Sequence, residues 1–287
     1  MPPKAPALPA CHAAARVADL DERAGPQRDC HEAERAVRFL VVVYWGAATF
    51  LVPWIAILLR TQPPDVLDHH SRRLWLVIGL LMFSGMVLTG VLYRFESNYA
   101  VISATFTATF LFVDAWFNIL TSTGSLLTLL IVFALVVQFP ISILSLFVAA
   151  RLVLNRHLVN KSPRLVPVVF IVSALLTVPS TVRRVAQSTP IHIGIHQRLA
   201  WSGLDVFEFV GLLLTGWCLR NRSPWLAIVG TVTGTLLISD AMFNVITSVS
   251  DAALAGLAMA VVAELPLAVI SFWLAFREIG SWAPATS

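Results

Sequence analysis

Long apolar runs constrain this chain more than any other feature, because each run is about as long as a lipid bilayer is thick. Roughly 20 apolar residues in a helix, at about 1.5 Å per residue, cross a hydrocarbon core about 30 Å thick. Lipid offers no hydrogen-bond partners, so each run must satisfy its backbone N–H and C=O groups internally, as a helix does. The sequence therefore predicts an all-α integral membrane protein. About eight transmembrane helices are expected, at Val37–Leu59, Leu74–Tyr93, Asn98–Leu120, Leu126–Ala150, Leu165–Val182, Leu199–Leu219, Pro224–Ile246 and Ala252–Phe276.

The composition agrees with this class. Hydrophobic residues make up 57% of the 287-residue chain and charged residues 13%, whereas a soluble domain carries roughly 25% charged residues. The three cysteines, Cys11, Cys30 and Cys218, form no CxxC pair, so we expect neither a cysteine-based metal site nor a structural disulfide. No nucleic acid partner is expected, because membrane orientation explains the excess of Lys and Arg. No cofactor is expected either, because the sequence has no P-loop and no GxGxxG motif.

The positions of Lys and Arg predict how the chain lies in the membrane. These residues accumulate on the cytoplasmic segments of membrane proteins. With the N-terminus inside, fourteen of the 20 Lys and Arg residues fall on inner segments and six on outer ones. We expect a cell-membrane protein with both termini cytoplasmic, a disordered tail over residues 1–36 and a short tail over residues 278–287.

The sequence repeats itself at an offset of 126 positions. LTGVLYRFES at Leu88–Ser97 matches LTGWCLRNRS at Leu214–Ser223, and DAWFNILTS at Asp114–Ser122 matches DAMFNVITS at Asp240–Ser248, without a gap. The same offset pairs prolines in other spans, so the similarity covers four helices. We expect two four-helix repeats, over residues 37–151 and 163–277, in the same orientation and related by a pseudo-two-fold axis along the membrane normal.

Polar side chains follow one face of the third expected span and recur in the seventh. Helical spacing places Thr107, Asp114, Asn118 and Thr121 on that face. A carboxylate at membrane depth is costly unless it is paired, hydrated or protonated, so it marks a functional surface or a buried network. Alternatively, Thr and Asn merely join helices and each aspartate pairs locally. The predicted substrate-binding residues on these two faces are Asp114, Asn118, Asp240, Asn244, Thr107 and Thr233.

Two histidines, His70 and His196, precede the second and sixth spans on the expected outer side. They belong to the predicted binding surface, because an outward-facing cavity would bring them near the two aspartates. A site of two His and two Asp ligands lacks any close ligand spacing such as HExxH. We therefore expect no metal there.

The second repeat carries carboxylates that the first lacks. Asp205, Glu208 and Glu264 stand where the first repeat has Gly79, Met82 and Gln138. Glu264 lies close to Pro266, which removes a backbone hydrogen bond, so its carboxylate can take up a proton or a cation or simply satisfy the loosened backbone. If the protein is an enzyme, the candidate catalytic acids are Asp240, Glu264 and Asp205.

The run HQRLAWSGLDVFE at His196–Glu208, followed by LISDAMFNVITS at Leu237–Ser248, resembles a group of uncharacterised multi-pass membrane proteins of actinobacteria. The pattern of that group is a His, then LAW-x-G-[FL]-D, then DAWFD-[VI]. Asn118 and Asn244 stand where the group usually has a second Asp, which weakens a mechanism with two carboxylates. The resemblance implies no particular activity.

Three functions remain open at this point. The first is binding or translocation of a small solute or ion through the polar faces of the third and seventh spans, with protonation of Asp240 or Glu264 as the coupling step. The second is a membrane-embedded enzyme acting on a lipid or prenyl substrate, similar in layout to small terpene cyclases, with a neutral buried carboxyl group as general acid. The third is a structural or regulatory membrane subunit.

Overall fold

Every element that the structure describes is a helix. The computed structural model describes the backbone of residues 26–61, 69–122, 124–154, 166–187, 195–247 and 257–282, and the side chains of residues 34–56, 76–120, 122, 127–154, 166–176, 199–244 and 257–282. The elements are α2 (Pro26–Thr61), α3 (His69–Arg94), α4 (Ala100–Thr121), α5 (Gly124–Phe133), η1 (Ala134–Gln138), α6 (Phe139–Leu154), α7 (Val166–Gln187), α8 (Ile195–Asn221), α9 (Leu226–Thr247), η2 (Ala260–Glu264) and α11 (Leu265–Gly280).

Seven helices within the described residues are long and apolar enough to cross a membrane. This confirms an all-α, multi-pass membrane protein. The remaining expected span, Leu165–Val182, coincides with α7, whose described apolar stretch, Val166–Leu176, is shorter than a span. Helix α2 begins at Pro26, so the end of the expected tail is helical.

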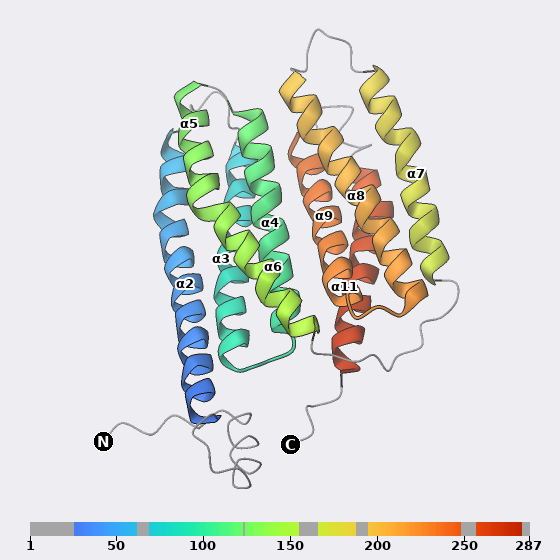
Figure 1. The fold of residues 1–287 in the computed structure, drawn as a ribbon. Helices are drawn as coiled ribbons and strands as arrows, with labels where there is room; N and C mark the ends of the chain where they lie inside the picture. Colours follow the sequence, from blue (N-terminus) through green and yellow to red (C-terminus); the bar gives the residue numbers. More distant parts are fainter. Residues whose placement is uncertain are drawn as a thin grey trace.

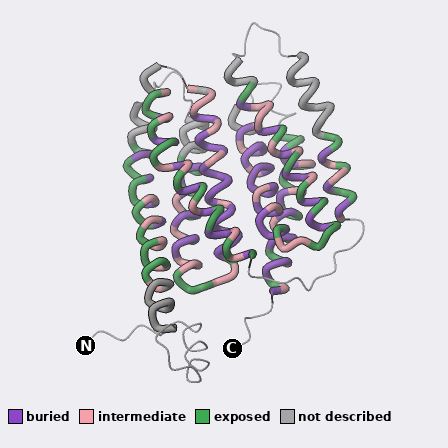
Figure 2. Tube along the Cα trace, in the orientation of Figure 1, coloured by how far each residue is buried: buried purple, intermediate pink, exposed green. Residues whose placement is uncertain are grey.

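The helices form two groups that meet along α4 and α9 (Figure 1). Helix α4 packs against α3 and α6, and α2 packs on α3. In the same way α9 packs against α8 and α11, and α7 packs on α8, while α8 also contacts α4. In the apolar stretches of α4 and α9, 78% of the residues are buried, against 50% or less in the other five. Figure 2 shows the buried residues concentrated on these two helices. Their side chains are therefore shielded from lipid by protein.

Short turns connect α3 to α4 and α8 to α9. Glu96 and Arg222 lie in the left-handed region, with φ of 52° and 51°. In each turn a serine N–H donates to the carbonyl five residues earlier, from Ser97 to Leu92 and from Ser223 to Cys218, both at 2.9 Å. The two turns, like the bounds of α4 and α9, lie 126 positions apart.

A π-helical turn interrupts the last long helix of each group, at η1 and at η2. Each turn is followed by a proline, Pro140 or Pro266, which has no N–H to donate to the preceding turn. The wider turn accommodates that loss, and π-helical turns are frequent at functional sites. It also fixes where Gln138 and Glu264, the last residues of η1 and η2, enter the interior, because both side chains are buried.

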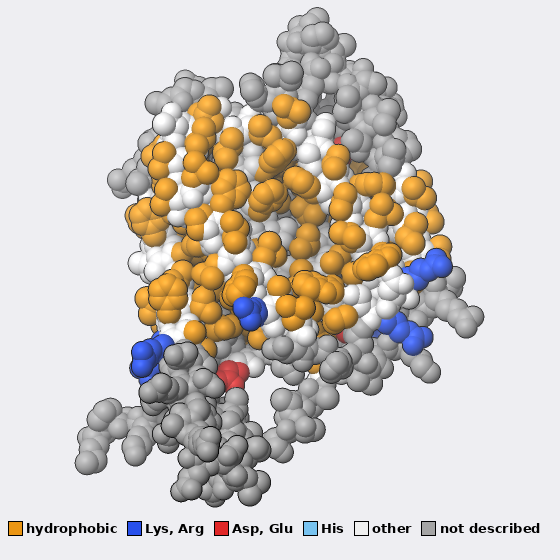
Figure 3. Space-filling view, viewed as in Figure 1, with side chains coloured by type: hydrophobic (Ala, Val, Ile, Leu, Met, Phe, Trp, Pro, Cys, Tyr) orange, Lys and Arg blue, Asp and Glu red, His pale blue; other side chains and the backbone are white. Residues whose placement is uncertain are grey.

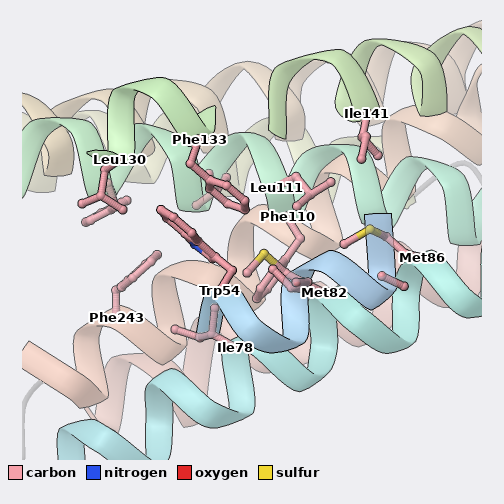
Figure 4. Close-up of a cluster of buried hydrophobic side chains, with 14 of the residues drawn as sticks. Trp54, Ile78, Met82, Met86, Phe110, Leu111, Leu130, Phe133, Ile141 and Phe243 are labelled. Carbon is pink, nitrogen blue, oxygen red and sulfur yellow. The ribbon is translucent and has the colours of Figure 1, made fainter. Parts of the chain in front are cut away.

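Aromatic stacking joins helices within the first group and across the seam. Trp54 on α2 stacks on Phe133 with ring centroids 3.9 Å apart, in the core that Figure 4 shows. Across the seam, Phe117 on α4 stacks on Phe243 on α9 with centroids 4.0 Å apart.

Trp116 fixes a close approach between α4 and α8. Its Nε1–H donates to the carbonyl of Ala200 at 3.2 Å. A Cβ on Gly203 would lie 2.5 Å from a carbon of the indole ring, so only glycine leaves room for the tryptophan there.

The outside of the bundle is apolar, as Figure 3 shows for one face. Large side chains such as Phe39, Val136, Ile143 and Val262 are exposed on it. Contact with lipid explains this exposure, because lipid tails solvate such side chains as well as a protein core does. The start of α2 and the end of α11 lie at the same end of the bundle (Figure 1).

Candidate functional site

Three carboxylates meet between α8 and α9, and we call Asp205, Glu208 and Asp240 the carboxylate cluster. One carboxylate oxygen of each residue lies within 4.8 Å of the others. The three side chains are 7%, 4% and 2% exposed. Asp205 and Glu208 are three residues apart and so share a face of α8, which turns toward Asp240 on α9.

Asn244 connects the cluster to a fourth carboxylate. Its Nδ2 donates to Oδ2 of Asp240 and to Oε1 of Glu264, both at 3.0 Å. Asn244 lies one turn after Asp240 on α9, and Glu264 enters from the π-helical turn η2. Four buried carboxyl groups therefore converge from α8, α9 and η2.

The equivalent positions of the first group hold one carboxylate. Oδ2 of Asp114 accepts hydrogen bonds from Asn118 Nδ2 at 2.9 Å and from Gln138 Nε2 at 2.6 Å. Gly79 and Met82 stand at the positions of Asp205 and Glu208. Two amide donors thus bind one oxygen of the single acid of the first group, whereas the second group has a carboxylate in place of one of these amides.

The two threonines of the predicted site hold neighbouring helices together. Thr233 Oγ1 lies 2.9 Å from Thr215 Oγ1 on α8, and Thr107 Oγ1 lies 3.3 Å from Thr89 Oγ1 on α3. A Cβ on Gly85 or Gly211 would lie within 3.0 Å of these threonine oxygens, so glycine allows the close approach. This is the interhelical role that small and hydroxyl residues commonly have in membranes.

The structure thus brings together Asp240, Asn244, Glu264 and Asp205 from the predicted residues, and it places Asp114 and Asn118 in a second network. The side chains of His70, His196, Thr121 and Thr247 lie outside the described residues. Glu208 was not among the predicted site residues. Its spacing of three from Asp205 was the available signal, because an i, i+3 pair of acids on a membrane helix places both on one face.

Full ionisation of the carboxylate cluster is energetically prohibitive. Two unit charges 4.8 Å apart repel by about 3 kcal/mol at an effective dielectric constant of about 20. Three such pairs cost on the order of 10 kcal/mol, comparable with the entire folding free energy of a typical domain. Desolvation adds several kcal/mol for each buried charge. Repulsion and desolvation therefore favour the uptake of protons or of a cation by the cluster.

No family model, curated protein or solved structure matches the chain. A multi-pass helical bundle is compatible with many activities, because function resides in sites and not in folds. The function therefore has to be argued from the carboxylates themselves.

Proposed function

We propose that this protein binds a hard divalent cation at the carboxylate cluster and moves it across the membrane in exchange for protons. The observation that carries the proposal is the convergence of three buried carboxylates from α8 and α9 within 4.8 Å, in helices long and apolar enough to span a bilayer. Ionisable residues inside membranes by default mark ion pathways and proton relays.

The spacing of the oxygens suits a cation between them. Oxygen ligands lie about 2.0–2.6 Å from Mg²⁺ or Ca²⁺, so two ligands on opposite sides of the ion are about 4–5 Å apart. All three oxygens meet this limit. Carboxylates favour Mg²⁺, Ca²⁺ or Mn²⁺ over softer metals. The sequence led us to expect no metal, because it lacks a close ligand motif; in the fold, an i, i+3 pair on α8 faces Asp240 on α9.

Exchange for protons follows from the charge balance. Without a cation, repulsion and desolvation favour the protonated form of the carboxyl groups. A divalent cation compensates these charges and so releases protons on entry. Glu264, held through Asn244 and carried on a π-helical turn, is the natural group to pass protons to and from the cluster.

The proposal includes an internal duplication in which the two groups are parallel four-helix repeats. Four features that recur at an offset of 126 support it: the helix bounds, the π-helical turns, the left-handed turn residues and the Asp–Asn hydrogen bonds. Eight spans with both termini cytoplasmic would follow. Single cysteines introduced as His196→Cys and His157→Cys test this, because the first should be labelled from outside the cell and the second only from inside.

The experiment uses the full chain, purified in detergent and reconstituted into liposomes. We expect saturable Mn²⁺ binding by electron paramagnetic resonance, proton release on binding, and Mn²⁺ uptake driven by an outward proton gradient. Asp205→Asn should weaken all three, and Asp114→Asn, the same acid-to-amide change in the first group, is the control. Absence of saturable binding, or binding and flux unchanged by Asp205→Asn, would overturn the proposal.

An enzyme acting on a prenyl substrate is the second candidate, favoured by aromatic rings on and against α8, the helix that carries two of the acids. Phe207 lies between Asp205 and Glu208 in the sequence, and its ring contacts Trp116 edge to face with centroids 5.5 Å apart. Aromatic faces stabilise cations, including those formed when a buried acid protonates an alkene. Conversion of polyprenyl substrates by the purified protein without added metal, abolished by Asp240→Asn, would favour this activity over transport.

A further inference from the structure

A small cavity lies at the seam between the two groups, apart from the carboxylate cluster. It is bounded by α3, α4 and α9, and its volume of about 10 Å³ is close to the minimum that holds one water molecule. Most of its wall is apolar and includes Ile78, Phe110 and Phe243, which Figure 4 shows among the core side chains. Asp114 and Ser239 supply the polar part of the wall.

Asp114 presents one unsatisfied oxygen in this environment. Both amide donors, Asn118 and Gln138, bind Oδ2, while Oδ1 is buried and has no hydrogen-bond partner in the described part of the chain. The side chain is only 5% exposed. A buried carboxyl oxygen without a partner is costly, so this oxygen requires either a proton with an acceptor for it, or a donor.

Ser239 also lines the cavity, and its hydroxyl can accept a hydrogen bond. Its hydroxyl donates to the carbonyl of Thr235 at 2.8 Å, so the lone pairs of Oγ remain available to accept. Ser239 is 2% exposed and has no counterpart hydroxyl in the first group, where Val113 occupies its position.

We propose that the cavity binds one water molecule between a protonated Asp114 and Ser239. The acid donates its Oδ1–H to the water, and the water donates to Ser239 Oγ, which in turn donates to Thr235. Asp114 Oδ1 then has a partner, and Oδ2 remains the carbonyl-type acceptor for Asn118 and Gln138. The first group thus holds a hydrated, neutral acid, separate from the cation site proposed above.

The surroundings select a proton over a metal ion at this position. The cavity offers one carboxyl oxygen and one hydroxyl, whereas hard cations take six or more oxygen ligands. The acids on the helices packed against α4 are Asp205 and Glu208 on α8 and Asp240 on α9. Any charge on these acids opposes a second negative charge on Asp114. No ionisable side chain other than Asp114 is among the described residues lining the cavity.

Infrared spectroscopy of the purified full chain tests both parts of this inference. A protonated carboxylic acid has a carbonyl stretch that a carboxylate lacks, and that stretch shifts when its hydrogen bond changes. The difference spectrum between wild type and Asp114→Asn should contain one such band. An Asp114→Asn difference spectrum without it shows that the acid is ionised and overturns the proposal.

The variant Ser239→Val keeps the test independent of the folding of Asp114→Asn. Valine is the residue at the equivalent position of the first group and fills the cavity with apolar atoms, so it should displace the water without loss of folding. The Asp114 band should persist in this variant but move to the frequency of a weaker hydrogen bond. An unshifted band shows a dry cavity and overturns the water site. Neither measurement depends on cation flux, so the outcome is separate from that of the transport experiment.

Discussion

The two groups differ in how the acids at equivalent positions are partnered. These positions are residues 114, 118 and 138 in the first group and residues 240, 244 and 264 in the second. In the first group Asn118 and Gln138 donate to one oxygen of a single acid. In the second, Asn244 bridges two acids, and two further acids, Asp205 and Glu208, approach from α8. Where the first group has Gln138 at its π-helical turn, the second has Glu264, so an amide donor is replaced by another acid. The difference teaches that equivalent backbone positions can hold a network around one acid or a cluster of four.

The largest expected difference between the two groups is in cation binding. Asp240→Asn removes a ligand and should weaken Mn²⁺ binding at least about 100-fold, equivalent to about 2.7 kcal/mol. Asp114→Asn removes the equivalent acid of the first group and should change the affinity less than about threefold, within about 0.7 kcal/mol. Equilibrium titration of both purified variants measures this. Equal losses in the two variants would show that both groups contribute to one site.

The next largest effect should come from giving the first group the second group's acid. Gln138→Glu removes the donor that lies 2.6 Å from Asp114 and places a second carboxyl group there. We expect a loss of about 2–3 kcal/mol in the free energy of unfolding, because an acceptor loses its partner and two acids compete for protons. Unfolding in detergent, followed by circular dichroism, measures it. Gln138→Met removes the donor alone and separates the two contributions; a Glu variant as stable as wild type would contradict the expectation.

Replacing an acid in the second group should raise the free energy of unfolding, by less than Gln138→Glu lowers it. In the cation-free protein, Glu208→Gln removes the cost of keeping a buried carboxyl group protonated at neutral pH and should raise the free energy of unfolding by about 1–2 kcal/mol. Met82→Gln, at the equivalent position of the first group, should lower it, because it buries a polar group among apolar side chains. The same unfolding assay, run with and without Mn²⁺, detects both changes. Destabilisation by Glu208→Gln in the absence of cation would indicate a purely structural acid.

Replacing the interhelical threonine of either group should have the smallest effect on stability, and the effect should be similar in both groups. Thr107→Val and Thr233→Val each remove one interhelical hydroxyl contact and should cost about 0.5–1 kcal/mol, the usual magnitude for such contacts in membranes. We also expect Thr233→Val to leave Mn²⁺ affinity within about twofold, or about 0.4 kcal/mol. A marked loss of Mn²⁺ affinity would show that Thr233 takes part in binding, as the sequence predicts.

Features within a single helix were predictable from the sequence. The contact between the acids of α8 and Asp240 on α9 was not. Hydrophobic length located the spans, and the spacing of four between Asp114 and Asn118 placed them on one face, where the structure pairs them. The rotation of α8 about its own axis was not readable, because lipid and protein interior are both apolar and leave little amphipathic signal. Glu208 was therefore seen as an extra acid, while its contact with Asp240 depends on that rotation.

The tryptophan that fills the space beside Gly203 has a consequence for assembly. The second group has Met242 where the first has Trp116, and the first has Val77, an exposed residue, where the second has Gly203. The tryptophan ring therefore belongs to the first group, and the recess that receives it, left by Gly203, belongs to the second. Two copies of the second group would have the recess without the ring, and two copies of the first would have the ring without the recess. The contact between Trp116 and Gly203 therefore needs one member from each group, and neither group could make it with a second copy of itself.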